Sequence, residues 1–311
     1  MKCLFVYNPV SGRGKTEKRL QKIVHALRER YGDVCVAATH AQGDMTRIVR
    51  ESAPLFDAIV FSGGDGTFNE ALQGVCESGC SPELGYIPSG TVNDVAHSLG
   101  IPKRLRGALR VIRSGRAVPL DCMKINDRYA MYIVAAGAFT SAPYTTPQSL
   151  KKQIGFVAYG IEGIKKNLNF DVFGVTVSDG ERSVHADSVF VVLMNGRYVA
   201  GIPLNRGSSM ADGKIEAALI HQRKNPGFFG KVRAFLALAR LFLLGYRVRE
   251  KQITRFEGSH FEIEAEESVV WNFDGEKGLS GKVTVDVVPG RIRMLVPRHR
   301  LSPHLNALLL V

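Results

Sequence analysis

Three glycines and one carboxylate lie together in the run Gly63-Gly64-Asp65-Gly66-Thr67. The run directly follows the apolar segment 58–62, which is typical of a buried strand, and directly precedes a helical pattern that starts at Phe68. Glycines at such a turn let backbone N–H groups approach an anion closely, and the helix N-terminus adds partial positive charge. The turn therefore predicts a phosphate-binding loop, although tight strand-to-helix turns also use glycine for conformation alone.

Two further loops follow apolar segments in the same way. Residues 8–12 follow the segment 3–7, and residues 88–94 follow the segment 84–87 and open another helical pattern. Because parallel strands of one sheet end at the same edge, the three loops are expected to converge on one crevice. Together they predict a nucleotide-binding site.

Two related motifs fit less well. Residues 9–16 nearly spell a Walker A loop, but Pro9 occupies its first glycine position and fixes φ near about −65°. The run 12–14 begins like a dinucleotide fingerprint, but Glu17 stands where the third glycine belongs. A P-loop enzyme and a Rossmann oxidoreductase are therefore disfavoured.

Composition indicates a globular protein with affinity for polyanions. The 311 residues are enough for two domains, and 41 Lys and Arg against 29 Asp and Glu give a net charge of +12. This balance favours nucleotide phosphates, nucleic acid or an anionic membrane leaflet. The sequence has no zinc-ligand spacing and no recognition-helix pattern, so nucleic acid is not an expected partner.

The five cysteines are odd in number and contain no C-x-x-C, which predicts neither a disulfide framework nor a zinc site. They are typical of buried thiols in a reducing cytoplasm. The N-terminus lacks the apolar region of a signal peptide, so a cytoplasmic protein is expected.

One long apolar stretch, 228–245, contains Lys231, Arg233 and Arg240, which makes it a poor membrane span. Arg233, Arg240 and Arg247 are seven residues apart and are expected on one face of a helix. Two interpretations stay open for this helix. It packs on the second domain, or it touches the bilayer interface.

Strand and helix patterns alternate up to residue 117, which predicts an α/β domain with a mainly parallel sheet. From residue 118 to 290 strand patterns dominate, which predicts an antiparallel β-sandwich. The expected strands are 2–7, 34–38, 58–62 and 84–87 in the first domain, and 129–135, 171–177, 189–194, 214–220, 260–265, 269–273 and 283–288 in the second.

These motifs resemble the diacylglycerol-kinase-type lipid kinases, a family that includes bacterial diacylglycerol kinases and sphingosine kinases. The resemblance spans almost the whole chain and is carried by 8–12, 63–67 with Asn69 and Glu70, 88–94, and Asp274-Gly275-Glu276. The glycine run is shared with NAD kinases and phosphofructokinases, whose fold the resemblance implies for the first domain. The late acidic triplet and the chain length favour the lipid branch. The resemblance also implies that residues 291–311 return to the first domain.

The resemblance implies ATP and Mg²⁺ as cofactors. For Asp65, contact with Mg²⁺, a phosphate-side water network and capping of a helix beginning at Phe68 are all open. The implied nucleotide-binding residues are Asn8, Pro9, Ser11, Gly12, Thr39, Gly63, Gly64, Asp65, Gly66, Thr67, Phe68, Asn69, Glu70, Thr91, Asn93 and Asp94.

For catalysis, the resemblance implies Glu276 as the acceptor of the hydroxyl proton and Asp274 as its partner, with Mg²⁺ as one link. A solvated Asp-Gly hairpin turn is the alternative for this triplet. A structural Mg²⁺ site is implied at Asp212, with Ser209 and Lys214 as flanking backbone ligands. Ala211 stands where some bacterial members have a second acid, so its occupancy is open.

The expected function is an ATP- and Mg²⁺-dependent lipid kinase that converts diacylglycerol to phosphatidic acid. Sphingosine and phosphatidylglycerol are alternative substrates, and a soluble NAD-type kinase or a nucleotide-binding membrane sensor are alternative classes. The expected partners are the lipid substrate and anionic phospholipid at the inner face of the membrane. The oligomeric state is left open between monomer and homodimer.

Overall fold

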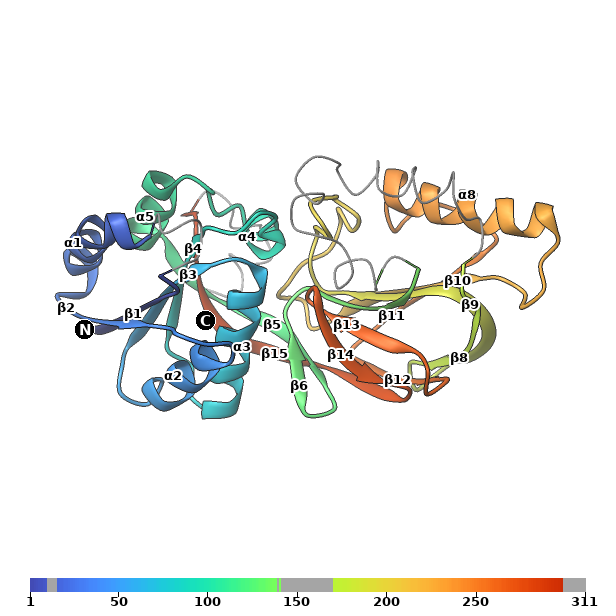
Figure 1. The fold of residues 1–311 in the computed structure, drawn as a ribbon, viewed down its shortest axis with the longest axis horizontal. Helices are drawn as coiled ribbons and strands as arrows, with labels where there is room; N and C mark the ends of the chain where they lie inside the picture. The colour runs from blue at the N-terminus through green and yellow to red at the C-terminus, as the bar shows by residue number, and fades with distance from the viewer. Residues whose placement is uncertain (10–15, 139, 141–169, 299–311) are drawn as a thin grey trace. The chain divides into compact units, whose positions relative to one another are not determined.

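The computed structural model describes residues 1–9, 16–138, 140 and 170–298 (Figure 1). It divides into two compact units. Unit 1 comprises Met1–Cys122, Met210–Gly213 and Val288–Val311, and unit 2 comprises Met123–Ser209 and Lys214–Val287. The expected domain boundary after residue 117 falls inside one strand of the structure.

Unit 1 is built on a parallel sheet in the order β2-β1-β3-β4. These strands are β1 (Lys2–Tyr7), β2 (Asp33–Ala38), β3 (Ala58–Gly63) and β4 (Glu83–Pro88). Every residue of β3 and β4 is buried, which explains why both read as unbroken apolar runs. The parallel register brings the ends of β1, β3 and β4 to one edge of the sheet.

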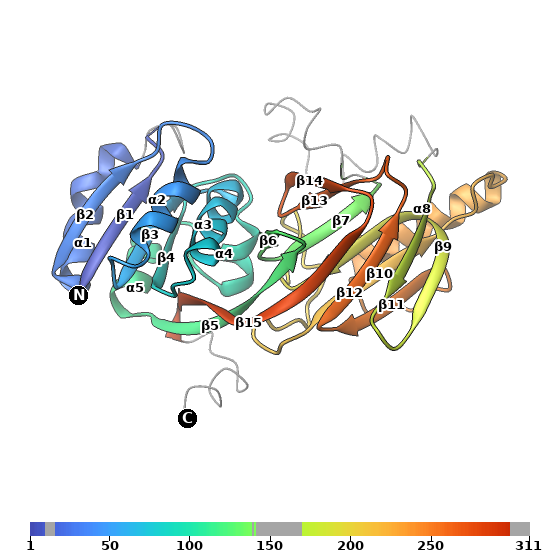
Figure 2. The same ribbon diagram turned by 90° about the horizontal axis from the view of Figure 1, so that it is seen from below.

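Helices cover both faces of this sheet (Figures 1 and 2). On one face lie α1 (Leu20–Tyr31), which follows a 3₁₀ turn at Glu17–Arg19, and α5 (Leu105–Ser114). On the other face lie α2 (Asp44–Ser52) and α3 (Asp65–Ser78). The short helix α4 (Asp94–Leu99) follows the loop after β4. Apolar residues at helical spacing, such as Ile23, Ala26 and Leu27 of α1, form the core with the sheet.

Unit 2 is a largely antiparallel β structure. Its strands pair in the order β14-β13-β7-β9-β8-β12, and β10 joins β9 to β11. The fully buried Trp271 lies in its core and donates its indole N–H to the Gly281 carbonyl at 2.8 Å. The strands are β6 (Arg128–Ala130), β7 (Ile133–Gly137), β8 (Phe173–Ser178), β9 (Ser183–Met194), β10 (Ile215–His221), β11 (Ile253–Gly258), β12 (His260–Ala265), β13 (Val270–Phe273) and β14 (Glu276–Ser280).

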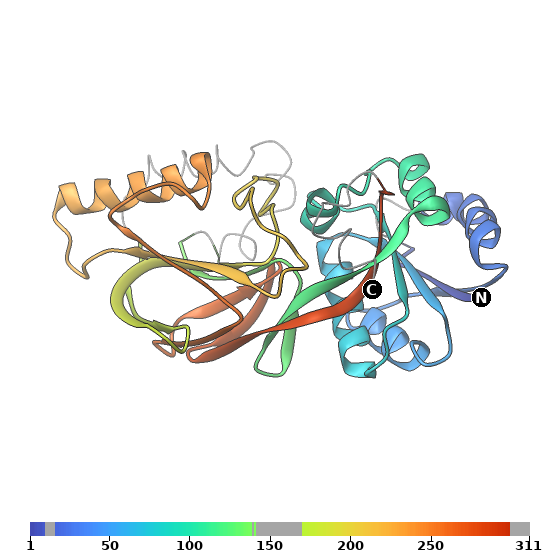
Figure 3. The same ribbon diagram turned by 180° about the vertical axis from the view of Figure 1, so that it is seen from behind.

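Two long strands contribute residues to both units. β5 (Arg116–Ile125) and β15 (Val283–Val296) pair with each other (Figure 3). Within unit 2, β15 pairs with β12, and within unit 1 its Met294 pairs with Leu84 of β4. The segment 291–311, expected to return to the first domain, is described up to residue 298.

A buried aspartate joins three chain segments inside unit 1. The carboxylate of Asp121 accepts the backbone N–H of Gly213 at 2.7 Å and that of Gly290 at 2.8 Å. Its own N–H donates to the carbonyl of Met210 at 2.8 Å. Asp121 thus holds the 210–213 segment and the middle of β15 against β5.

The apolar stretch forms helix α8 (Phe228–Leu244), which packs on the sheet of unit 2 beside β10. The spacing predicted that Arg247 shares one helical face with Arg233 and Arg240. This prediction is wrong, because Gly245 ends the helix and Arg247 lies beyond it. No helix among the described residues is long and apolar enough to span a membrane.

The predicted fold class is confirmed, and several details differ, including β9, which begins at Ser183, and β15, which extends to Val296. The predicted strand 129–135 is two strands, broken at Met131 and Tyr132. The helix expected from Phe68 begins at Asp65. The strands β5, β11 and β14 have no counterpart in the predicted list.

Candidate active site

Two of the three predicted loops of unit 1, those after β3 and β4, are linked by hydrogen bonds at the carboxyl edge of the parallel sheet. The Gly63 carbonyl accepts the N–H of Ser89 at 2.8 Å, which joins the loop after β3 to the loop after β4. The hydroxyl of Ser62 lies 3.1 Å from that of Thr16 and 3.5 Å from that of Ser89. The loops after β3 and β4 therefore meet as predicted, whereas the convergence of residues 8–12 with them stays a prediction, because residues 10–12 lie outside the described residues.

Gly64 and Gly90 allow the two loops to touch through their backbones. A Cβ on Gly90 would lie 2.5 Å from the Gly64 Cα, and one on Gly64 would lie 3.2 Å from the Gly90 Cα. The sequence predicted the close approach of an anion at Gly64. The structure adds a second reason, because a side chain at either position would push the loops apart.

Asn93 closes the loop after β4. It has a left-handed backbone (φ 62°), and its amide side chain bonds the N–H and the carbonyl of Gly90 at 3.0 and 2.9 Å. The buried hydroxyl of Tyr86 lies 3.1 Å from Asn93 Oδ1 and 3.2 Å from the Gly63 carbonyl. Burial, aided by the charges of Asp65 and Asp94, raises the pKa of Tyr86, so this hydroxyl keeps the proton that it donates.

Asp65 connects the two glycine-containing loops. Its two carboxylate oxygens accept the N–H groups of Asn93 and Asp94, each at 2.7 Å. The predicted capping of a helix beginning at Phe68 is wrong, because Asp65 is itself the first residue of α3, and its carboxylate instead binds the N–H groups at the start of α4. Burial raises the pKa of Asp65, and the N–H bonds from Asn93 and Asp94 oppose that rise.

The remaining predicted nucleotide-binding residues lie at the same edge of the sheet or on α3. Asn8 and Pro9 directly follow β1, and the buried Thr39 directly follows β2 and donates its N–H to the Tyr7 carbonyl. Gly66, Thr67, Phe68, Asn69 and Glu70 form the first turns of α3, and Thr91 follows Gly90. Ser11 and Gly12 lie outside the described residues.

The acidic triplet of unit 2 forms a hairpin turn. Asp274 and Gly275 both have positive φ, 52° and 93°, and the flanking residues Phe273 and Glu276 pair across β13 and β14. This is the two-residue loop that an Asp-Gly pair favours. The two acids occupy different environments, since Asp274 is 2% exposed whereas Glu276 is exposed at the start of β14.

The carboxylate of Asp274 is bound by three consecutive backbone N–H groups. Oδ2 accepts Met131 at 2.6 Å, and Oδ1 accepts Tyr132 and Ile133 at 2.9 and 3.1 Å. These bonds explain why the predicted strand is broken here. The buried Asn195 holds the same segment, because its Nδ2 donates to the Met131 carbonyl at 2.8 Å and its N–H to the Tyr132 carbonyl.

Four participants in this geometry had no predicted role in the site. Tyr86, Gly90 and the segment 131–133 were absent from the predicted site, and Asn195 carried no assigned role. Gly90 lies inside the predicted loop, so its glycine was a usable signal. The segment 131–133 has no local signal, because its partner Asp274 is more than 140 residues away in sequence.

Two of the residues assigned to a structural metal, Asp212 and Lys214, are exposed. The ammonium of Lys214 lies 3.0 Å from Glu257 Oε1. Among the described residues no group of three or more His, Cys, Asp or Glu side chains could hold a metal ion. A site at Ser209, Asp212 and Lys214 would need backbone carbonyls as ligands, so this assignment stays a prediction.

A parallel α/β unit with linked loops after β3 and β4, followed by an antiparallel β unit, is the fold seen in kinases of the diacylglycerol kinase type. Residues 2–125 match the diacylglycerol kinase catalytic domain, and residues 133–296 match the YegS C-terminal NAD kinase beta sandwich-like domain. The chain belongs to the diacylglycerol kinase family of lipid kinases, whose members use ATP.

Named relatives match along most of the chain. It is 30% identical to a diacylglycerol kinase of Bacillus subtilis (strain 168), covering 88% of this chain and 89% of that protein. It is 31% identical to a protein of Klebsiella pneumoniae (strain 342) named as a YegS-like lipid kinase, covering 93% and 94%. A crystal structure described as a diacylglycerol kinase of Bacillus anthracis str. Sterne superposes with a TM-score of 0.83 at 26% identity, covering 96% of both chains.

Asp65→Asn is expected to weaken ATP binding by about tenfold or more. The amide can accept only one of the two N–H groups and turns its own NH₂ group toward the other, and a hydrogen bond to a charged group contributes roughly 1.5–3 kcal/mol. Calorimetric titration with ATP measures the effect. Asp57→Asn is the matched control, because Asp57 accepts the N–H of Lys2 at the opposite edge of the sheet. Equal affinities in both variants would contradict the role of Asp65.

Proposed function

We propose that this lipid kinase transfers the γ-phosphoryl group of ATP to the hydroxyl of diacylglycerol and so produces phosphatidic acid. The observation that carries the proposal is that one chain combines the linked loops at the ends of β3 and β4 with the Asp274-Gly275 turn and Glu276. The extended match to a Bacillus subtilis protein named diacylglycerol kinase supports this choice of substrate.

The loops of unit 1 have the chemistry to hold the triphosphate. The first N–H groups of α3 have no partner within the helix, and Gly63 and Gly64 precede them without side chains. Asp65, Asn93 and the Gly64–Gly90 contact fix the shape of this region before nucleotide arrives. ATP, when bound there, supplies the phosphoryl group.

Glu276 is the proposed proton acceptor. As the lipid hydroxyl oxygen bonds to the γ-phosphorus, the bond to the bridging oxygen of ADP breaks, and the hydroxyl proton passes to the Glu276 carboxylate. An exposed carboxylate on the rim of a rigid turn suits this role. Asp274 is the proposed positioning residue, because both of its oxygens bind backbone N–H groups and fix the turn that carries Glu276.

Mg²⁺ is the proposed metal cofactor. When bound with ATP it neutralises charge on the phosphates. Asp212 is the proposed acidic ligand of a second, structural ion, with backbone carbonyls of Ser209 and Lys214 beside it. For Asp65 we favour the positioning role over direct metal binding, since its carboxylate already binds Asn93 and Asp94.

Transfer of labelled phosphate from ATP to lipid alcohols in mixed micelles tests the function. Diacylglycerol is expected to be the preferred acceptor in a panel with sphingosine and phosphatidylglycerol, and chelation of divalent cations is expected to stop the reaction until Mg²⁺ is restored. Preference for another lipid alcohol would replace diacylglycerol as substrate. Turnover of NAD, or binding of ATP without any transfer, would favour the soluble kinase or the sensor.

A further inference from the structure

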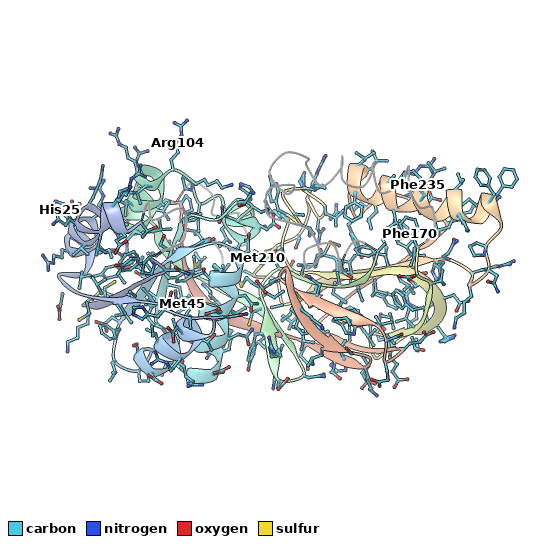
Figure 4. All side chains as sticks on the ribbon, in the orientation of Figure 1. His25, Met45, Arg104, Phe170, Met210 and Phe235 are labelled. Carbon is cyan, nitrogen blue, oxygen red and sulfur yellow. The ribbon has the colours of Figure 1, made fainter. Side chains whose placement is uncertain are left out.

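Helix α8 presents two apolar faces, of which only one is covered. Ala234, Ala237, Leu238 and Leu241 are buried against unit 2, and the ring of Phe242 lies 5.9 Å from that of Phe190. This inner face accounts for the packing role that the sequence left open. Other side chains of α8 project away from the sheet of unit 2, as Figure 4 shows along the helix that carries the labelled Phe235.

The outer face carries an exposed apolar stripe. Phe229, Leu236 and Leu243 are seven residues apart, so they follow one line along the helix, and their exposed fractions are 79%, 43% and 59%. Phe228 and Leu244 extend the exposed apolar surface at the two ends of the helix, at 66% and 63%. Contiguous exposed apolar surface of this kind marks an interaction site.

Cations accompany this stripe. Arg233 and Arg240 lie four residues after Phe229 and Leu236, which places them on the same side of the helix, and both are exposed. Arg240 pairs with Glu250, whereas α8 itself contains no Asp or Glu. The outer face therefore combines apolar side chains with positive charge, as amphipathic helices at bilayer surfaces do.

We propose that the outer face of α8 docks on an anionic lipid bilayer, with Phe229, Leu236 and Leu243 in the interface and Arg233 beside the headgroups. This inference rests on the lipid kinase activity only in that the substrate resides in a bilayer. Charge complementarity selects the partner, since the chain carries +12 and the helix lacks acids. A second copy is a poor occupant, because symmetric pairing would set the cations of one helix against those of the other.

Sedimentation with unilamellar vesicles tests the proposal. Wild-type protein is expected to bind vesicles of mixed phosphatidylglycerol and phosphatidylcholine, and to bind pure phosphatidylcholine vesicles weakly. Phe229→Ser with Leu243→Ser is expected to lower binding about tenfold or more, and Arg233→Glu to lower it several-fold with a weaker dependence on salt. If the double variant melts at a lower temperature than the wild type, the single variant Phe229→Ser replaces it in the vesicle assay.

Matched controls lie on unit 1. Leu55 is 68% exposed and Arg110 is exposed on α5, so Leu55→Ser and Arg110→Glu change the same chemistry elsewhere and are expected to leave vesicle binding unchanged. Wild-type binding by the double α8 variant would overturn the proposal. The proposal would also be overturned if the wild-type protein did not bind vesicles and instead formed a dimer that the α8 substitutions dissociate.

A separate assay distinguishes this proposal from the proposed function. Short-chain diacylglycerol dispersed in solution requires no bilayer, so the α8 variants are expected to phosphorylate it at the wild-type rate and to lose rate only on vesicles. Absence of turnover by the wild type would overturn the proposed function and leave the vesicle result standing. An equal loss of rate with dispersed short-chain diacylglycerol and with diacylglycerol in vesicles would overturn the docking role of α8.

Discussion

Glu276→Gln is expected to lower kcat by roughly 10²- to 10⁴-fold, the usual contribution of a positioned general base. The amide keeps the size of the side chain but cannot accept the hydroxyl proton. ATP affinity is expected to stay within a few-fold of wild type, because the proposed nucleotide site lies in the loops of unit 1. Rates at saturating ATP, Mg²⁺ and diacylglycerol, together with a calorimetric ATP titration, measure both quantities.

The stability of this variant provides the control. Glu276 is exposed, so its substitution is expected to change the free energy of unfolding by less than about 0.5 kcal/mol. A kcat close to that of wild type would show that another carboxylate accepts the proton, with Asp65 and Asp94 as the next candidates. A large loss of stability would mean that the lost rate reports on folding.

Asp274→Asn is expected to lower the free energy of unfolding strongly, in contrast to Glu276→Gln. The remaining oxygen can keep the N–H groups of Tyr132 and Ile133, but the new NH₂ group faces the N–H of Met131. A buried donor left facing a donor costs about 2–3 kcal/mol, which lowers the melting temperature by roughly 5–10 °C in a unit of this size. Thermal unfolding followed by circular dichroism measures this change.

Comparison of the two variants separates catalysis from positioning. Asp274→Asn is expected to lose rate because the turn that carries Glu276 loosens, and its Mg²⁺ dependence is expected to stay that of wild type. An unchanged melting temperature with a shifted Mg²⁺ requirement would instead support the metal-linked role that the family resemblance implied for Asp274.

Elements with strong local patterns were predictable from the sequence. The strands at 2–7 and 260–265 have the expected bounds, because apolar periodicity and flanking turn residues define them locally. The strand β14 was not predictable in this way. It reads Glu-Lys-Gly-Leu-Ser at the edge of its sheet, and it exists because the Asp274-Gly275 turn folds it back onto β13.

In the candidate site, too, local motifs were predictable from the sequence and long-range contacts were not. The loop motifs predicted that residues after β1, β3 and β4 converge, since parallel strands end at a common edge. The reasons for individual residues depend on contacts that are distant in sequence. Gly64 meets Gly90, Asp65 reaches Asn93, and Asp274 breaks a predicted strand 142 residues earlier at Tyr132.

The chain path through unit 1 has a consequence for biosynthesis. β4 obtains β15 as its neighbour only when Met294 has been made, and Asp121 waits for Gly213 and Gly290 to supply its two N–H donors. N-terminal domains commonly fold first while the ribosome is still translating. Here the strands that carry the proposed nucleotide-binding loops emerge first, yet the unit that contains them is completed last. An open strand edge at β4 therefore persists through most of synthesis, and its pairing partner Met294 is made 210 residues after Leu84.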